Sequence, residues 1–147
     1  MQRWYRIIIP SVRKDGGFTI WGVIDMGIQE DAVNFHRQGF NCAQSVLAAS
    51  GKYTVLAQDT ALRIAAGFGG GVRSGEICGA ISSAVMALGL AEQDKRKVAA
   101  LTKDCVESFR KEFGCVRCLD LKQNRVSCDA LITYGARFVE EQLKQKD

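Results

Sequence analysis

The chain has 147 residues, about the length of one domain, and can bury a hydrophobic core without metals or disulfides. Apolar residues make up 47% and charged residues 24%, which excludes an intrinsically disordered chain. The net charge of +4 is too small to indicate nucleic-acid binding, and no apolar run approaches the roughly 18 residues of a membrane span. We therefore expect no nucleic-acid partner and no membrane span.

Residues 1–25 differ from the remainder of the chain because they contain no cysteine and no helical pattern. One interpretation is a short hairpin, with strands at Ile7–Ile9 and Phe18–Ile24. The other is a flexible extension, with translation starting at Met26, and we favour this second interpretation. The cysteine-rich helical domain is then assigned to residues 26–147.

From Met26 onward the sequence predicts helices separated by glycines. An apolar stripe over residues 28–36 ends at Gly39. Asn41 and Gln44 have the spacing of a capping box, which predicts a helix over residues 42–49 that Gly51 closes. Another helix is expected over residues 59–66, before a glycine-rich loop at 67–75.

Three further helices complete the prediction. Residues 78–90 are apolar and small on all sides, which is typical of a helix in the middle of a bundle and also leaves room for a homodimer. Residues 94–113 form an amphipathic pattern that Gly114 ends, and Ser127 caps a last helix that runs to about Leu143. The fold class is therefore all-α, a bundle of five or six helices.

The glycine-rich loop has the outline of a phosphate-binding loop but not its chemistry. Gly75 is followed by Glu76 where phosphate binding requires Lys, and a carboxylate repels phosphate. The loop is either a tight interhelical connection or a place of close backbone approach. In the second case the N–H groups of Gly69, Gly70 and Gly71 could bind a sulfur or an anion of a cofactor.

The chain has six cysteines and one histidine, which excludes a His-rich metal site; the cysteines are Cys42, Cys78, Cys105, Cys115, Cys118 and Cys128. No secretory signal is visible, so we expect a cytoplasmic protein, in which structural disulfides are rare. Cysteines at this density then indicate metal, cluster or thiol redox chemistry.

The position of these cysteines is informative. Cys42 and Cys128 each follow a predicted cap, and Cys78 opens the apolar helix. Three cysteines therefore lie at predicted helix starts, where the helix dipole favours the thiolate form. Cys105 lies mid-helix on an apolar face and is predicted to pack in the core. Cys115 and Cys118 form a CxxC pair without the histidine of a haem site or the second pair of a zinc ribbon.

Several motifs together resemble a family of redox-active proteins named for the pattern C_GCAxxG_C_C. The resemblance covers residues 26–143, and its motifs are Asn41-Cys42-Ala43-Gln44, Phe68-Gly69-Gly70-Gly71, Cys78-Gly79-Ala80, Leu88-Gly89-Leu90, Phe113-Gly114, Cys118-Leu119 and Cys128. It implies that Cys42, Cys78, Cys118 and Cys128 are the functional cysteines, with Cys105 and Cys115 as extras. One position departs from the family, since Ser83 stands where the motif has its last glycine.

The resemblance implies redox activity and leaves its chemistry open. A similar cysteine region in the split-Soret type of cytochrome c is associated with an iron–sulfur cluster, and this chain lacks the CxxCH of the haem site. Our first hypothesis is that the four cysteines bind an iron–sulfur cluster for electron transfer with a redox partner protein. The second is a metal-free thiol–disulfide couple, and the third is a structural zinc site in an interaction module.

Overall fold

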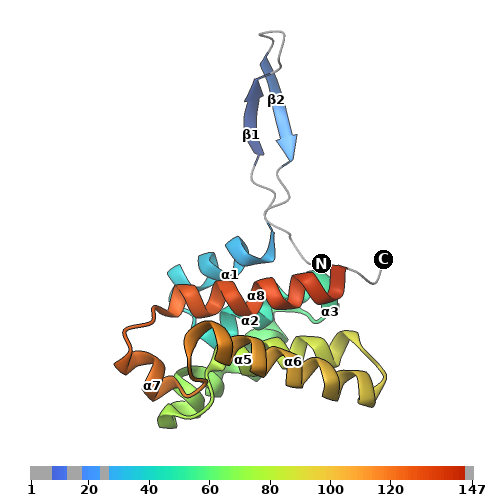
Figure 1. Ribbon diagram of the computed structural model, residues 1–147. Helices are drawn as coiled ribbons and strands as arrows, with labels where there is room; N and C mark the ends of the chain where they lie inside the picture. The colour runs from blue at the N-terminus through green and yellow to red at the C-terminus, as the bar shows by residue number, and fades with distance from the viewer. Residues whose placement is uncertain (1–7, 13–17, 24–26, 145–147) are drawn as a thin grey trace.

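The computed structural model describes residues 8–12, 18–23 and 27–144, and helices account for most of the last range (Figure 1). The elements in chain order are β1 (Ile8–Val12), β2 (Phe18–Val23), α1 (Ile28–Arg37), α2 (Cys42–Ala49), α3 (Gly51–Thr54), α4 (Gln58–Ala65), η1 (Ala66–Phe68), η2 (Gly71–Gly75), α5 (Gly79–Ala91), α6 (Lys95–Phe113), α7 (Cys118–Gln123) and α8 (Cys128–Lys144). The predicted all-α class is confirmed for the bundle. No helix in the described ranges is both long and apolar enough to cross a membrane.

The two strands form an antiparallel hairpin that precedes the bundle. Ile8 pairs with Val23 and Val12 with Phe18, with an irregularity in the register between Ile9 and Ser11. Figure 1 shows this hairpin standing away from the helices. The strands correspond to the hairpin interpretation of the first 25 residues. Met26 lies outside the described residues, so its assignment as a translation start stays a prediction.

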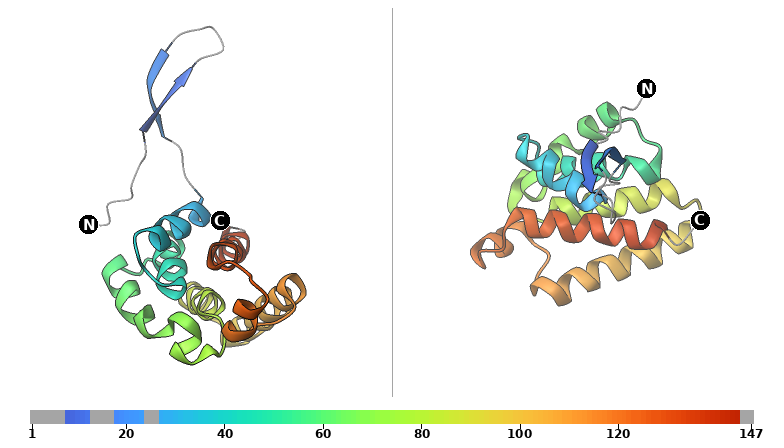
Figure 2. Two further views of the ribbon diagram at one scale, coloured as in Figure 1. Left: turned by 90° about the vertical axis from the view of Figure 1, so that its left-hand side faces the viewer. Right: turned by 90° about the horizontal axis from the view of Figure 1, so that it is seen from above.

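The apolar helix α5 lies in the middle of the bundle, as its sequence predicts. It packs against α2, α6 and α8, and Figure 2 (left) shows it nearly end-on between them. Ala80, Ala84 and Ala87 are fully buried along it. The crossing with α8 is close, since a Cβ on Gly135 would lie 3.0 Å from the carbonyl oxygen of Ala80. The apolar composition of α5 is therefore explained within one chain, without a second copy.

Helix ends agree with the predicted caps at most positions, and Asp94 adds a cap that was not predicted. Asp94 caps α6 through a hydrogen bond from the Arg96 N–H, and Gly114 ends this helix with φ +82°. Gly51 does not close the second helix, because Ser50 stays right-handed and Gly51 begins α3. The chain leaves the helical conformation only at Val55, which has φ +57°.

Helix α7 lies between Gly114 and Ser127, where no helix was predicted. It is six residues long and carries Asp120 in its first turn. Cys118 and Leu121, three residues apart, are the buried residues of this helix. That spacing, with an acidic residue in the first turn, is the local signal that could have identified it.

Candidate redox site

Each of the four cysteines that the resemblance singles out lies at the start of a helix. Cys42 is the first residue of α2, Cys78 is the N-cap of α5, Cys118 begins α7 and Cys128 begins α8. The N–H groups of a first helical turn have no partner within the helix and carry partial positive charge. The predicted helix starts at Cys42, Cys78 and Cys128 are confirmed, and Cys118 adds a fourth.

A capping box fixes the position of Cys42. The Asn41 side chain accepts a hydrogen bond from the Gln44 N–H at 2.9 Å, and the Gln44 side chain accepts one from the Asn41 N–H at 3.0 Å. The same two side chains then reach the end of α4. Asn41 donates to the Ala66 carbonyl at 3.0 Å, and Gln44 donates to the Leu62 carbonyl at 2.9 Å. Cys42 is thereby held beside the glycine-rich segment that follows α4.

The three glycines proposed as cofactor-binding residues have different roles in this segment. A Cβ on Gly69 would lie 2.6 Å from the Asn41 side chain, so Gly69 allows the glycine-rich segment to approach the cap. Gly70 has φ +63°, and its N–H donates a hydrogen bond to the Cys42 sulfur. Gly71 has φ +64°, and a Cβ there would lie 2.5 Å from the Glu76 nitrogen. Of the three, Gly70 is the one whose N–H lowers the pKa of the Cys42 thiol, and a cofactor-binding role for these glycines stays a prediction.

Cys42 and Cys78 are hydrogen-bonded to each other through their side chains. The Cys78 thiol donates to the Cys42 sulfur and lowers the pKa of Cys42 to about 6, with the N–H groups of Gly70, Ala43 and Gly79 acting in the same direction against the effect of burial. The same hydrogen bond, together with burial and the negative charge of Cys42, raises the pKa of Cys78. The pair therefore favours the negative charge on the Cys42 sulfur and the proton on the Cys78 sulfur.

Cys42, whose pKa is lowered, is also the more exposed of these two cysteines. Cys78 is 1% exposed, whereas Cys42 is half-buried. Gly79 brings the start of α5 against the Cys42 sulfur, since a Cβ there would lie 2.7 Å from it and 2.7 Å from the Phe68 carbonyl oxygen. The pair therefore consists of an accessible thiolate and an enclosed thiol.

Cys118 is held beside Cys78 by an isolated antiparallel bridge in which Ile77 lies opposite Arg117. The Cys78 N–H donates to the Val116 carbonyl at 2.9 Å, and the Cys118 N–H donates to the Glu76 carbonyl at 2.6 Å. Side chains alternate along such a bridge, so those of Cys78 and Cys118 lie on the same face. This tertiary pairing also fixes where α7 begins.

Cys128 belongs to the same region through its electrostatic environment. Burial raises the pKa of the Cys128 thiol, and the negative charge of Cys42 raises it further. Cys118 and Asp129 act in the same direction, while the positive charge of Lys122 opposes them. The structure therefore brings Cys42 and Cys78 into direct contact, and Cys118 and Cys128 close enough to act on the others.

The one histidine of the chain lies next to this region. His36 on α1 contacts Asp129 with an Nδ1 to Oδ1 distance of 2.7 Å, and Asp129 directly follows Cys128. The contact fixes the start of α8 against α1. The two residues are 93 positions apart, so no local pattern in the sequence could have paired them.

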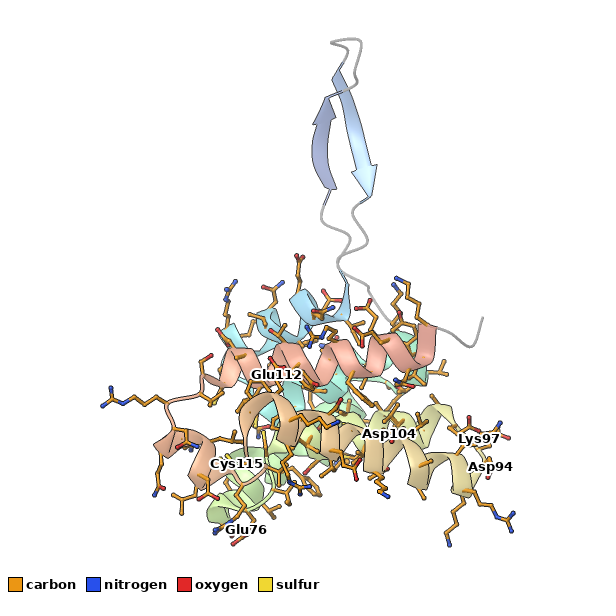
Figure 3. All side chains as sticks on the ribbon, in the orientation of Figure 1. Glu76, Asp94, Lys97, Asp104, Glu112 and Cys115 are labelled. Carbon is orange, nitrogen blue, oxygen red and sulfur yellow. The ribbon has the colours of Figure 1, made fainter. Side chains whose placement is uncertain are left out.

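The two remaining cysteines lie apart from the hydrogen-bonded pair. Cys105 is 1% exposed on α6, which confirms its predicted place in the core, and burial raises its pKa to about 12. Cys115 is half-buried in the connection between α6 and α7. Its sulfur lies 3.9 Å from the Phe113 carbonyl oxygen and 3.8 Å from the Asn124 side-chain nitrogen. Figure 3 shows Cys115 at the same end of the bundle as Glu76.

Metal binding at this site depends on how its donor atoms are arranged. Within residues 8–12, 18–23 and 27–144, no group of three or more His, Cys, Asp or Glu side chains is arranged so that it could hold a metal ion. The four cysteines therefore do not fit a metal ion in this arrangement. What the arrangement supplies is a hydrogen-bonded sulfur pair, with two further thiols nearby.

Comparisons with known proteins give one match. The family model described as "Putative redox-active protein (C_GCAxxG_C_C)" matches residues 40–142, which include all four helix-start cysteines and the glycine-rich segment. Searches among curated proteins and among solved structures gave no significant match. Because the family model spans well over half of the chain, the chain belongs to the C_GCAxxG_C_C family of redox-active proteins.

Proposed function

We propose that this redox-active protein works by thiol–disulfide exchange and that Cys42 and Cys78 are its reacting pair. The observation that carries the proposal is the close approach of the two helix starts, since the Cys42 sulfur lies against Gly79, the residue that follows Cys78, and the Cys78 side chain lowers the pKa of Cys42. Only the thiolate attacks a disulfide, and Cys42 is the cysteine whose pKa lies below neutral pH and whose side chain is half-buried rather than enclosed. Cys78 is in contact with it and protonated, as a resolving thiol must be.

The exchange has two steps. The Cys42 thiolate attacks one sulfur of a substrate disulfide, which forms a mixed disulfide and releases the other half of the substrate as a thiolate. Cys78 then gives its proton to this leaving group and attacks the Cys42 sulfur, which releases the second half of the substrate. Two electrons pass to the substrate, whose disulfide becomes one thiol, protonated by Cys78, and one thiolate, which takes its proton from water, and the protein retains a Cys42–Cys78 disulfide. A dithiol partner protein would reduce this disulfide again.

The backbone of the site supports the first step. The N–H groups of Gly70, Ala43 and Gly79 donate to the Cys42 sulfur while it carries negative charge. These groups are held in place by the capping box and by the close contact of Gly79 with Cys42, so little reorganisation accompanies the reaction.

An iron–sulfur cluster bound by Cys42, Cys78, Cys118 and Cys128 is a second candidate, favoured by the electrostatic coupling of Cys128 to both Cys42 and Cys118. Four thiolates from separate helix starts are a suitable donor set in chemical type. Among the described residues no three such donors are arranged around a single metal ion. Zinc held by the same four thiolates would therefore require the sulfurs to move together.

One preparation distinguishes these candidates. Protein purified without oxygen is examined for visible absorption, for iron, zinc and sulfide, and for its thiol content before and after treatment with a small disulfide. Thiol–disulfide exchange predicts a colourless, metal-free protein that loses two thiols reversibly. Brown protein that contains iron and sulfide would contradict it in favour of the cluster, and stoichiometric zinc would contradict it in favour of a structural site.

Variants of the CxxC pair add a matched control. If a cluster or zinc is bound, Cys118→Ser removes metal from the protein whereas Cys115→Ser does not, because Cys115 faces Phe113 and Asn124. If the proposed exchange is correct, Cys42→Ser abolishes the reversible loss of thiols, whereas Cys78→Ala stops the reaction at the mixed disulfide of Cys42, with the loss of one thiol instead of two. Cys105→Ala leaves it intact, since Cys105 is enclosed in the core.

A further inference from the structure

An open groove lies beside the cysteine pair, between η2 and α7. Its volume is about 400 Å³, and its lining includes Gly70, Arg73, Cys118, Leu119 and Lys122. Gly70 connects the groove to the reacting thiol, because its N–H donates to the Cys42 sulfur. The buried Cys118 lines the groove directly. A molecule bound in the groove would therefore lie against the cysteines.

The charged side chains that line the groove are all positive. Arg73 and Lys122 contribute two cationic side chains, and none of the lining residues is acidic. Neither cation has an ion-pair partner among the described residues. The neighbouring Arg117 differs, because it pairs with Glu76 at 3.4 Å and with Asp120 at 3.9 Å. The groove thus carries an uncompensated positive charge, which attracts anions.

The backbone that presents Arg73 has an uncommon conformation. Gly70, Gly71, Val72 and Arg73 all have positive φ values between 56° and 64°. Non-glycine residues disfavour the left-handed conformation, so the fold maintains it at Val72 and Arg73 against their intrinsic preference. This turn places Arg73 in the groove wall, together with the glycine whose N–H reaches Cys42.

The groove also has an apolar side. Leu119 lines it and is 46% exposed. Cations together with exposed apolar surface suit an organic anion better than an inorganic one. A carboxylate can meet the cations while the carbon skeleton covers the apolar side chain.

We propose that this groove binds the carboxylates of an organic disulfide substrate, with Arg73 and Lys122 recognising its negative charge. That the bound molecule reacts with Cys42 rests on the proposed thiol–disulfide exchange. That the groove prefers anions rests on the residues that line it. Binding of the charged ends in the groove brings the sulfur–sulfur bond toward Cys42.

The kinetic test compares two chromogenic disulfides, dithiobis(nitrobenzoate), which carries two carboxylates, and uncharged dithiodipyridine. Rate constants for modification of Cys42 are measured in a Cys115→Ser background at neutral pH and low salt. Replacing both Arg73 and Lys122 by Gln should slow the anionic probe by about tenfold and leave the neutral probe unchanged. Equal effects on the two probes, or no effect on either, would overturn the inference.

Lys97→Gln is the matched control for removal of a positive charge. Lys97 is exposed, and Figure 3 shows it at the opposite end of the bundle from Glu76, the residue that follows η2. The control should leave both rate constants unchanged. If it slows the anionic probe as much as the groove variant does, the effect reflects net charge and the groove is not the binding site.

A binding measurement separates failure of the inference from failure of the proposed function. In the Cys42→Ser variant, oxidised glutathione, which carries carboxylates, should shift the amide NMR signals of Gly70 and Gly75. Replacement of Arg73 and Lys122 by Gln should remove these shifts. If oxidised glutathione does not shift these signals in the Cys42→Ser variant, the inference is overturned. Lack of reaction at Cys42 with either chromogenic probe would instead overturn the proposed function, while the NMR result would still decide whether the groove binds anions.

Discussion

The hydroxyl of Ser83 donates a hydrogen bond of 2.7 Å to the carbonyl oxygen of Ala43, and both residues are fully buried. Ala43 directly follows Cys42, and Ser83 lies on α5, which Cys78 caps. The contact therefore joins the two helices whose first residues carry the reacting sulfurs. It also explains how the chain accommodates Ser83 where the family motif has glycine, because the small side chain fits between the helices and satisfies its own hydroxyl.

Ser83→Ala should lower the free energy of unfolding by about 1 kcal/mol, the usual net value of one hydrogen bond. Ser83→Val should cost more, since two added methyl groups must fit between α2 and α5. Denaturant unfolding of both variants measures the difference. A valine variant as stable as the alanine variant would show that the helices are not closely packed at this point.

Gly79→Ala should disrupt the site as well as the fold. The added Cβ would lie 2.7 Å from the Cys42 sulfur and 2.7 Å from the Phe68 carbonyl oxygen, and a backbone atom cannot move away cheaply. We expect a loss of unfolding free energy on the order of 1–3 kcal/mol and slower modification of Cys42. Gly67→Ala is the matched control, because a Cβ at Gly67 meets nothing within 4 Å. Equal stability of the two variants would contradict the close approach.

The pH dependence of Cys42 alkylation follows from its pKa of about 6. Iodoacetamide reacts with the thiolate, so the rate should be near its plateau at neutral pH and should fall as the pH drops through 6, where the sulfur takes up a proton. Cys78→Ala removes the main cause of the low pKa, so the midpoint of the profile should move upward toward that of an ordinary cysteine, about 8.5. An unchanged midpoint would show that Cys78 does not donate to Cys42.

Val72→Gly should stabilise the protein. Val72 is β-branched, 50% exposed and held at φ +58°, a conformation that glycine adopts without strain. Relief of roughly 1–2 kcal/mol of strain exceeds the added chain entropy of glycine, about 0.5–1 kcal/mol, so denaturant unfolding should show a net gain of about 0.5–1 kcal/mol. Val55→Gly, at φ +57° outside the glycine-rich segment, should give a similar gain. If Val72→Gly lowers the stability while Val55→Gly does not, the contacts of the Val72 side chain stabilise the protein more than the strain destabilises it.

Local patterns in the sequence predicted the parts of the site that local interactions form. The box of Asn41 and Gln44 joins residues three apart, so its spacing was sufficient to place Cys42 at the start of α2. The apolar composition of the segment after Cys78 likewise placed α5 in the centre. These features arise within single helices and are visible without knowledge of the tertiary structure.

Other parts depend on contacts between distant segments. The pairing of Cys42 with Cys78 follows from how α2 crosses α5, and the contact of His36 with Asp129 joins α1 to α8. Helix α7 is short, and its start is fixed by the hydrogen bond from the Cys118 N–H to the Glu76 carbonyl. The left-handed conformation of Val72 opposes its own preference, so its residue type could not indicate it.

Peptide mapping after oxidation tests the central claim most directly. The protein is treated with one equivalent of a small disulfide, its remaining thiols are blocked, and the digest is analysed by mass spectrometry without reduction. We predict a cross-linked peptide that contains Cys42 and Cys78, formed with the loss of two thiols and reversed by dithiothreitol. A linkage that excludes Cys42 or Cys78, such as one between Cys115 and Cys118, would contradict the account.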